Sequence, residues 1–597
     1  MIPFSGELIY TGQVNSVQSG VVRMNRRVPY GIMNYAELIK ENGYFVDKTR
    51  YISELEKYKN PVFLRPRRFG KSLLCSMLAY YYDISEAERF KELFGNTWIG
   101  KNPTRYHNQY IILKFDFSVI PVSHNIDEVE TNFNIYCNGV LSDMQFSYPD
   151  IMSEAPKPSL QTPSSLNLVR WLSYLNQTNS PQVYVIIDEY DNFVNQYITR
   201  YQDHIYQEIT SGDSFLRTFF KTLKEGRQTG AIANIFITGV LPIALDDLTS
   251  SYNIATFLTL DSSFESMLGF TQNEVDLLLD KIYQDYAIDP STRHQVNEVI
   301  KSQYDGYHFV NPDGEAVYNS TMLMFFLRDF CDKKVIPKQL TDLNLRTDLS
   351  WVKRITNSLE NTEEIVSELI TKSGIAYDDD YLVSKFNVSQ FFDKQYYPIS
   401  LFYLGMVTKK DQFLLTLPNL NMQKIFTEYF NELNAIDVST RYATMMQKFI
   451  DNPDLDTLFE DYWRLYVNQL PEAVFSQVNE NFYRTTFYEL CSRYLSIWFT
   501  WNIERSYPRG RTDLEFVGKF HEKFAGLRWV IEFKYFSNTE WSGMKTPIEQ
   551  FEVRKEDTLQ IQGYAEGLRQ EYPEAKIRLF VIYCIGNQGF RVIEVTN

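Results

Sequence analysis

The sequence lacks the features of secreted, zinc-binding and membrane-spanning proteins. Its five cysteines are widely scattered, form no C-x-x-C pair and have no histidine nearby, which argues against a disulfide framework and against a zinc site. No apolar run approaches the length of a membrane span, and the first residues lack the basic and apolar regions of a signal peptide. These absences predict a cytoplasmic protein that does not associate with membranes.

Positive charge is also in short supply. The 59 basic residues are outnumbered by 75 acidic residues, which gives a net charge of −16. A surface of that charge does not attract nucleic acid as a whole, so any polynucleotide must meet a local basic groove. A chain of 597 residues is too long for one core and predicts about three or four domains.

The most informative feature that is present is a Gly-Lys-Ser turn between a buried strand, residues 61–64, and an amphipathic helix. In such a loop the backbone N–H groups surround phosphate oxygens, Lys71 reaches the outer phosphates and the Ser72 hydroxyl binds Mg²⁺. Arg65 stands where the usual pattern has glycine. A bare Gly-Lys-Ser is also an ordinary helix start, but the strand-loop-helix context favours a nucleotide site.

A second buried strand, residues 183–187, ends in Asp188 and Glu189. In a P-loop NTPase an Asp at this point binds Mg²⁺ and a following Glu polarises the attacking water, so we assign these roles to Asp188 and Glu189. The alternative is a strand followed by a solvated acidic turn. Residues 235–239 predict a third strand, which places the Thr238 hydroxyl where a γ-phosphate sensor would lie, although Thr-Gly is also a common strand exit.

A different chemistry is predicted near the C-terminus. Residues 511–517 and 529–534 read as neighbouring strands. Because the strand period is two, Glu532 and Lys534 project to one face, where Asp513 of the neighbouring strand can join them. Two carboxylates on a divalent cation, with an ammonium beside them, suit phosphodiester hydrolysis with Mg²⁺ or Mn²⁺.

Other polar residues extend this second group. Glu480, at the start of a predicted helix, adds a third carboxylate, and Gln560 and Tyr564 lie one helical turn apart and face the same way. The alternative for the Glu-x-Lys pair is two solvated side chains on an exposed sheet face. The Gly-Arg-Thr-Asp context of Asp513 favours the metal site.

Together these residues resemble a family of bacterial proteins with an AAA-ATPase-like N-terminal domain and a C-terminal PD-(D/E)XK nuclease-superfamily domain. The matching segments are residues 28–32, 44–49, 65–72, 187–191, 237–240, 304–307, 318–319, 510–513 and 532–534. The P-loop form Arg-Pro-Arg-Arg-Phe-Gly-Lys is usual in that family, which implies that Arg65 is a family trait. The resemblance also implies ATP and Mg²⁺ as cofactors, and a role in defence or in the biology of mobile elements.

The sequence patterns and the resemblance together predict an α/β fold in three parts. These are a P-loop NTPase domain of the AAA/ASCE-like type with a parallel sheet and a helical lid, a helical and winged-helix-like middle, and a restriction-endonuclease-like α/β domain. We place the N-terminal extension, ATPase-like domain, lid, linker domain and nuclease-like domain at residues 1–27, 28–265, 266–340, 341–470 and 471–597. The wing predicted at residues 405–417 has few basic residues, so we favour a spacer over a DNA-binding module.

The site assignments follow from these motifs. Nucleotide binding is assigned to Arg67, Arg68, Phe69, Gly70, Lys71, Ser72, Leu73, Asp188 and Thr238. Metal binding is assigned to Ser72, Asp188, Asp513 and Glu532, and catalysis to Glu189, Glu480, Asp513, Glu532, Lys534 and Gln560. Arg67, Arg68 or an arginine of a neighbouring subunit would stabilise charge on the γ-phosphate, and the last choice requires oligomers.

Two functions of different classes fit these assignments. The first is a nuclease regulated by ATP, acting on DNA in preference to RNA. The second is an ATP-driven switch whose C-terminal domain binds nucleic acid or protein without cutting, and the acidic net charge favours it. A plain ATPase with a decayed tail is a third reading. Six basic residues near the second site favour the nuclease if they share one face: Arg505, Arg509, Arg511, Lys519, Lys523 and Arg528.

Overall fold

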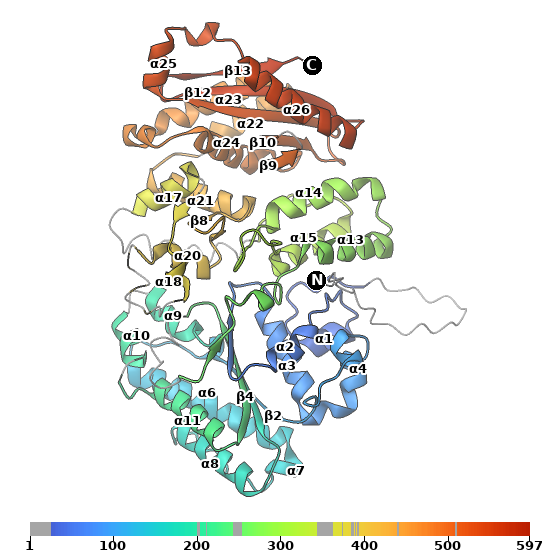
Figure 1. The fold of residues 1–597 in the computed structure, drawn as a ribbon, viewed down its shortest axis with the longest axis vertical. Coiled ribbons are helices and arrows are strands. Elements are labelled where there is room, and N and C mark those ends of the chain that lie inside the picture. The colour runs from blue at the N-terminus through green and yellow to red at the C-terminus, as the bar shows by residue number, and fades with distance from the viewer. Residues whose placement is uncertain are drawn as a thin grey trace, which may run out of the picture.

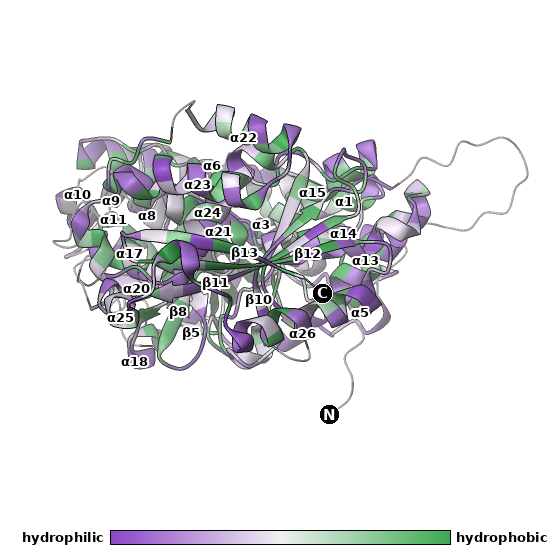
Figure 2. Ribbon diagram, turned by 90° about the horizontal axis from the view of Figure 1, so that it is seen from above, coloured by the Kyte–Doolittle hydropathy of each residue, from purple (hydrophilic) through white to green (hydrophobic). Residues whose placement is uncertain are grey.

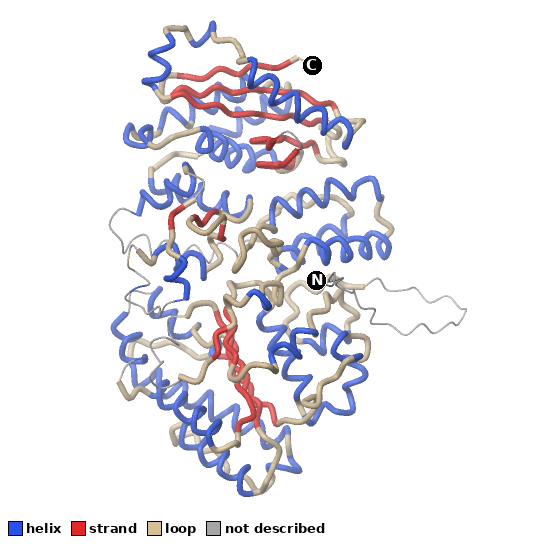
Figure 3. The backbone as a smooth tube through the Cα atoms, in the orientation of Figure 1, coloured by secondary structure: helices blue, strands red, loops and turns tan. Residues whose placement is uncertain are grey.

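The computed structural model has an N-terminal α/β unit at one end, a mostly helical middle and a second sheet at the C-terminal end (Figure 1). Figure 3 shows the two sheets as separate groups of strands. The structure describes residues 26–199, 203–210, 212–242, 253–342, 362–372, 374–383, 387, 390, 393, 395–438, 441–507 and 510–596. Most of the predicted N-terminal extension, and Arg509, lie outside these residues. The layout confirms the expected fold class.

The N-terminal sheet is parallel throughout and has the strand order β2-β3-β4-β1-β5. Its strands are β1 (Pro61–Leu64), β2 (Ile111–Asp116), β3 (Val183–Asp188), β4 (Ile232–Gly239) and β5 (Thr256–Phe257). Every residue of β1 and β3 is buried, as expected of strands covered on both faces. Because the strands are parallel, the carboxyl ends of β1, β3 and β4 meet at one edge of the sheet.

Helices cover both faces of this sheet (Figures 1 and 3). One group is α1 (Tyr35–Lys40), α2 (Arg50–Leu55), α3 (Lys71–Tyr82), α4 (Phe90–Phe94) and α5 (Trp98–Lys101). The others are α6 (Ile126–Ser147), α7 (Pro149–Met152), α8 (Ser164–Gln177), α9 (Asn192–Thr199), α10 (Asp203–Thr210) and α11 (Phe215–Gln228). Seen from above, the helices of the molecule mix hydrophilic and hydrophobic residues, as amphipathic covering helices do (Figure 2).

The middle of the molecule is helical, with one small sheet. The predicted lid contains α13 (Gln272–Tyr286), α14 (Arg293–Tyr304) and α15 (Ser320–Lys333). After it come α17 (Thr362–Thr371), β6 (Ile375–Ala376), α18 (Asp379–Val383), α20 (Tyr397–Tyr403), β7 (Thr408–Lys409), β8 (Leu414–Thr416) and α21 (Leu420–Leu433). The antiparallel hairpin of β7 and β8 follows a helix as predicted for a wing, and β6 adds a third strand to it.

The C-terminal unit is built on a mixed sheet of strand order β13-β12-β11-β10-β9. Its strands are β9 (Phe499–Tyr507), β10 (Gly510–Gly518), β11 (Leu527–Phe536), β12 (Lys576–Ile585) and β13 (Gly589–Val595). Only β11 and β12 are parallel neighbours, and α25 (Asn538–Met544) and α26 (Lys555–Glu571) lie between them in the chain. The helices before the sheet are α22 (Arg441–Asp451), α23 (Leu455–Leu465) and α24 (Glu480–Leu495).

Aromatic packing joins α22 and α23 to this C-terminal sheet. Phe449 of α22 meets the Trp529 ring edge-on, with centroids 5.4 Å apart. The ring centroid of Phe459 of α23 lies 6.1 Å from that of Phe533 and 5.1 Å from that of Phe590. Both helices therefore pack on the C-terminal sheet, although they precede the boundary predicted at residue 471.

Membrane spans are absent from the described residues. None of their helices combines the length and the apolar character that crossing a bilayer requires.

Candidate functional sites

The loop between β1 and α3 bends at two left-handed residues. Gly70, the N-cap of α3, has a φ of 98°, which glycine adopts without a steric penalty. Arg68 has a φ of 72°, and its carbonyl accepts a hydrogen bond of 3.1 Å from the N–H of Thr321 in the lid. Because Lys71 is the first residue of α3, the N-terminus of that helix opens on the loop. This geometry suits a bound phosphate.

The charged side chains of this loop meet the end of β3. Lys71 Nζ lies 3.3 Å from the carbonyl oxygen of Pro66 and 3.4 Å from Glu189 Oε1. The Ser72 side chain hydrogen-bonds Asp188, which is fully buried. Burial, followed by the charge of Glu189, raises the pKa of the Asp188 carboxyl to about 6, against the opposing effects of Ser72 and Lys71.

Those oxygen atoms fit a magnesium ion. A hydroxyl and a carboxylate in contact are hard oxygen donors, which Mg²⁺ prefers. Asp188 is also buried beside a second carboxylate, so a cation would favour its charged form. Ser72 and Asp188 would hold the ion, and Lys71 would contact the outer phosphates of a nucleotide.

Arg65 faces away from the loop and into the protein. Its guanidinium is buried, donates to the carbonyls of Leu64 and Thr259 at 3.1 and 2.8 Å, and lies 4.3 Å from the ring centroids of Phe63 and Phe309. Burial lowers its pKa to about 9. The arginine at the usual glycine position therefore fastens β1 to later segments and takes no part in the phosphate-facing surface.

A cleft of about 430 Å³, here called the nucleotide cleft, opens beside the P-loop. It is lined by P-loop residues from Arg68 to Leu74, by Glu189, and by two walls. One wall is N-terminal, from residues 29–33 and 44–48, and the other belongs to the lid, from residues 267–270 and 320–324. The motifs at residues 28–32 and 44–49 had no role assigned from the sequence, and the structure places them here. Their apolar side chains suit the base and sugar of a nucleotide.

Not every residue predicted for nucleotide binding reaches this cleft. Phe69, Gly70, Lys71, Ser72 and Leu73 line it, and so does Arg68, while Arg67 does not. Thr238 is fully buried at the end of β4, and its hydroxyl donates to the carbonyl of Phe63 at 2.7 Å. The structure thus directs Thr238 toward β1, because a strand hydroxyl inside a covered sheet takes the nearest backbone acceptor.

Asp191 is a structural residue that the sequence reasoning missed. Its buried carboxylate accepts from the N–H groups of Val240 and Leu241, at 3.2 and 2.8 Å, and from Asn195. A Cβ on Gly239 would lie 2.3 Å from its Oδ1, which explains the glycine. The Asp-Glu-Tyr-Asp segment therefore shapes the loop after β4 as well as supplying Asp188 and Glu189.

The predicted catalytic residues of the C-terminal unit meet where β10 and β11 separate. The register that places Leu514 opposite Ile531 brings Asp513 beside Glu532. Asp513 Oδ2 accepts from the N–H of Phe533 at 2.7 Å. The side chain of Asp513 thus binds a backbone group that would otherwise pair within the sheet. Lys534 Nζ lies 2.9 Å from Glu532 Oε1, and the Gln560 amide donates to the same oxygen at 2.6 Å.

Gln560 also links this group to helix α26. Its amide nitrogen lies 2.6 Å from the hydroxyl of Tyr564, one turn along the helix, as the sequence predicted. Lys534 donates to its amide oxygen at 3.3 Å. The structure therefore brings Asp513, Glu532, Lys534 and Gln560 together.

The electrostatics of this group fit a divalent cation. Burial, then the charge of Asp513, raises the pKa of the Glu532 carboxyl to about 8. Glu532 Oε2 is buried and has no hydrogen-bond partner among the described residues. Those residues contain no group of three or more His, Cys, Asp and Glu side chains placed to hold a metal ion. Asp513 and Glu532 would therefore be the two acidic ligands.

Glu480 forms no hydrogen bond or ion pair with these ligands in the described part of the chain, but its charge interacts with those of Asp513 and Glu532. It is the first residue of α24 and reaches the surface, but partial burial of its carboxyl, followed by the charge of Asp513, raises the pKa of that carboxyl. It therefore adds negative potential near Asp513, and its role as a third catalytic carboxylate stays a prediction.

The basic residues near this group do not share one face. Arg528 is buried and pairs with Glu515 at 2.8 Å, and Lys519 is buried with its ammonium 3.0 Å from the carbonyl of Pro337. Lys523 donates to the carbonyl of Ile450 at 2.6 Å. These three are committed to packing between elements, so they do not meet the condition of one shared face under which the six basic residues would favour the nuclease.

Metal affinity at the C-terminal site is expected to rise with pH. A carboxyl ligand must lose its proton before it binds a cation, so the proton on Glu532 competes with the metal below its pKa of about 8. The apparent affinity for Mn²⁺ should rise by up to roughly tenfold per pH unit below that value and level off above it. Calorimetric titration across that range measures the effect. A flat profile, or the same profile in Glu532→Gln, contradicts it.

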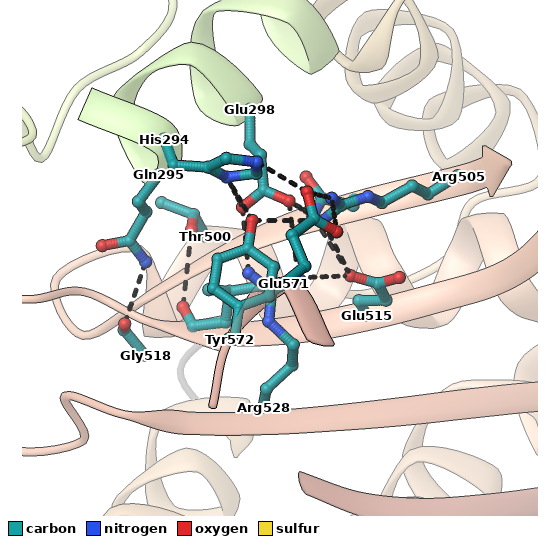
Figure 4. Close-up of polar contacts among 12 residues, drawn as sticks. His294, Gln295, Glu298, Thr500, Arg505, Glu515, Gly518, Arg528, Glu571 and Tyr572 are labelled. Atoms are coloured by element: carbon teal, nitrogen blue, oxygen red, sulfur yellow. Dashed lines mark hydrogen bonds and ion pairs between the residues drawn. The ribbon is translucent and has the colours of Figure 1, made fainter. Parts of the chain in front are cut away.

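A polar network joins the lid helix α14 to the C-terminal sheet (Figure 4). Glu298 pairs with Arg505 of β9 and, at 2.9 Å, with Arg528 of β11. Arg528 also pairs with the fully buried Glu515 of β10, and Arg505 pairs with Glu571 of α26 at 2.6 Å. One helix of the lid is therefore tied to three strands of the sheet.

Further contacts strengthen the same interface. His294 Nε2 lies 2.6 Å from Glu571, and its Nδ1 contacts the Tyr572 hydroxyl. The Gln295 amide donates to the carbonyl of Gly518 at 3.0 Å and accepts from the N–H of Phe520 at 3.1 Å. The contact between the two units thus depends on ion pairs and on hydrogen bonds between the Gln295 side chain and backbone groups of the C-terminal sheet unit.

The fold and the two sites define an ATPase-like P-loop unit combined with a nuclease-like sheet unit. Comparison with known families agrees: residues 29–249 match the family model described as predicted AAA-ATPase, and residues 478–594 match that of the PD-(D/E)XK nuclease superfamily. The chain is also similar to an uncharacterized protein encoded in the vnfD 5' region of Azotobacter chroococcum mcd 1. The two are 23% identical over 546 residues, which cover 85% of this chain and 89% of that protein. The chain therefore carries an AAA-ATPase-like domain and a PD-(D/E)XK nuclease-superfamily domain.

Proposed function

We propose that this protein is a metal-dependent nuclease whose cleavage of nucleic acid, DNA in preference to RNA, is regulated by ATP. The observation that carries the proposal is the contact between α14 of the lid and the sheet that bears Asp513 and Glu532. The lid also forms one wall of the nucleotide cleft. The lid therefore lines the nucleotide cleft and also contacts the sheet that carries the metal-site residues.

The connection from the P-loop to α14 includes two backbone hydrogen bonds. Thr321 N–H donates to the carbonyl of Arg68, and Asn319 N–H donates to the carbonyl of Tyr304 at the end of α14, at 3.1 and 2.9 Å. Phe69 of the P-loop also meets the Tyr307 ring edge-on, with centroids 5.0 Å apart. A change in the P-loop upon nucleotide binding would therefore be felt at α14, which is what regulation of the nuclease site requires.

Each residue of the C-terminal site has a distinct chemical role in the proposed mechanism. Asp513 and Glu532 would hold a divalent cation, and such an ion, when bound, supplies a nucleophilic hydroxide and neutralises charge on a phosphodiester. The Lys534 ammonium, held by Glu532 and Gln560, is placed to stabilise negative charge on the reacting phosphate. Gln560 orients both Glu532 and Lys534.

The second candidate is a switch that binds nucleic acid or protein without cutting. The net charge of −16 and the dispersal of Arg528, Lys519 and Lys523 into packing contacts favour it. A cleavage assay separates the two functions. Wild-type protein is incubated with single-stranded and duplex substrates in Mg²⁺ or Mn²⁺, with and without ATP, after nucleotide binding has been shown. Cleavage that stops on chelation supports the nuclease, and binding without cleavage supports the switch.

Replacing Glu298 by Gln is expected to uncouple the two sites. The change removes the carboxylate that pairs with Arg505 and Arg528 and leaves both nucleotide and metal residues in place. Allosteric coupling of this kind is worth about 1–3 kcal/mol, or a five- to 150-fold effect. The effect of ATP on the cleavage rate should fall below about twofold, with ATP affinity unchanged.

The matched control is Asp332→Asn, an exposed carboxylate of the lid that makes no ion pair within the described structure. It should keep the full effect of ATP. If Glu298→Gln also keeps it, the α14 contact does not carry the regulation.

A further inference from the structure

A second cleft, of about 690 Å³ and here called the polar cleft, lies between the lid, the middle and the C-terminal unit. Its walls come from α14, from the turn after β7, from α21, and from α24 with β9 and β10. The described lining contains three carboxylates and five basic side chains. The basic residues are Lys301, Lys410, Arg484, Arg505 and Arg511. This local excess of positive charge is unusual for a chain with a net charge of −16.

Three of these cations are available for a ligand. Lys301, Lys410 and Arg511 are exposed, and within the described part of the chain their side chains form no ion pair or hydrogen bond. Arg484 differs, because it is only 6% exposed and its Nε has no hydrogen-bond partner among the described residues. A buried guanidinium nitrogen without an acceptor costs free energy, which an anionic ligand in the cleft would recover.

Glu504 occupies the centre of this positive group. It is a strand residue with a left-handed φ of 51°, a strained conformation for glutamate, and its side chain is 47% exposed. Its carboxylate lies 2.9 Å from Arg484 Nη2. Burial would raise the pKa of this carboxyl, but Arg484, Lys410 and Arg511 outweigh burial and lower it. Cations from three separate elements therefore surround one carboxylate.

Arg484 links the polar cleft to the metal-site residues. Arg484 Nη1 lies 3.7 Å from Asp513 Oδ1, so one guanidinium contacts both Glu504 and Asp513. The register of β9 and β10 places Glu504 opposite Asp513, and Arg511 is two residues before Asp513 on β10. A phosphate chain bound among these cations would therefore lie next to the catalytic carboxylates.

The size and chemistry of the cleft select its ligand. About 690 Å³ lies within the range of small-ligand pockets, roughly 300–1,000 Å³. A volume of this size suits a few nucleotides of one extended strand. The described lining contains no Phe, Tyr or Trp on which bases could stack, so contacts would go to phosphates.

We propose that the polar cleft binds the phosphate backbone of a single-stranded nucleic acid and guides it to Asp513 and Glu532. In the absence of a strand, the Glu504 carboxylate takes the place of a backbone phosphate on Arg484. Lys410 extends the site to the hairpin of the middle unit, which is thus part of the binding surface as well as a spacer. The proposal rests on the proposed function for its substrate class.

The test measures binding of a labelled single-stranded oligonucleotide in the presence of a chelator, so that cleavage plays no part. Each phosphate contact contributes about 0.7 to the slope of log affinity against log salt for single strands. The double variant Lys410→Gln/Arg511→Gln should lower affinity at least tenfold at low salt and reduce the slope by about 1.4. Glu504→Gln should bind more tightly than wild type, because no carboxylate competes for Arg484.

The control is Lys40→Gln/Lys91→Gln, which removes the same charge from exposed positions of the N-terminal unit. It should leave both affinity and slope unchanged. Equal affinity and slope in the cleft double variant and wild type overturns the proposal, and so does tighter binding of duplex than of single strand. Displacement of the strand by an acidic polypeptide at equal charge concentration overturns it in favour of a protein partner.

DNA and RNA strands are tested side by side to distinguish the two sources of phosphate. The outcomes also separate this proposal from the proposed nuclease. Binding that depends on Lys410 and Arg511, without any metal-dependent cleavage, would support the polar-cleft proposal and rule out the proposed nuclease activity. Cleavage that is unaffected by the double variant would do the reverse.

Discussion

Glu532→Gln is expected to abolish metal-dependent cleavage, with a loss on the order of 10³-fold or more. The substitution removes the carboxylate charge while keeping the shape of the side chain. Its amide oxygen still accepts from Lys534 and Gln560, so the fold around the site should be preserved. The buried Oε2, which has no partner among the described residues, becomes an amide nitrogen that cannot bind a cation.

The measurement is cleavage of labelled substrates in Mg²⁺ and Mn²⁺, together with ATP binding by the same protein. ATP affinity should be unchanged, because the two sites lie in different sheets. Glu549→Gln serves as the control, since it neutralises an exposed carboxylate of the same domain. Cleavage by Glu532→Gln at the wild-type rate would remove the nuclease assignment.

Lys71→Ala is expected to lower ATP affinity about 10- to 100-fold. Lys71 is the cation at the start of α3, and hydrogen bonds to charged groups contribute about 1.5–3 kcal/mol each. Its loss also removes the ammonium whose positive charge offsets the repulsion between Asp188 and Glu189. Titration with a fluorescent ATP analogue measures the affinity.

The control for this variant is Lys91→Ala, an exposed lysine of α4, which should bind ATP normally. Thermal unfolding of both variants reports whether the loss of Lys71 disturbs the fold. If Lys71→Ala binds the analogue as tightly as wild type while remaining folded, the P-loop is not the nucleotide site.

The parts of each site that are close together in the chain could be predicted from the sequence. Gly70, Lys71 and Ser72 follow from the meeting of a strand and a helix, and Asp188 from the end of a buried strand. Asp513 and Glu532 followed from strand period and from the short connection between two strands, because such a connection fixes the pairing. These inferences needed only local pattern.

Contacts between segments distant in the chain could not be predicted in this way. The environment of Arg65 is made by Thr259 and Phe309, and no local pattern shows a guanidinium turning into the core. Thr238 sits at the predicted strand end, but its hydroxyl direction depends on the neighbouring strand β1. The pairing of Glu298 with Arg528 depends on how the lid meets a sheet more than two hundred residues later.

The walls of the nucleotide cleft have a thermodynamic consequence. Met33, which precedes β1 in the chain, and Met324 of the lid both line it, and Lys48 pairs with Glu274 of the lid at 2.6 Å. A molecule held between these walls stabilises the closed arrangement by a free energy that grows with the logarithm of one plus its concentration divided by its dissociation constant. Occupancy therefore slows reversible opening of both edges together, and amide hydrogens at the N-terminal edge and in the lid would exchange more slowly as one unit.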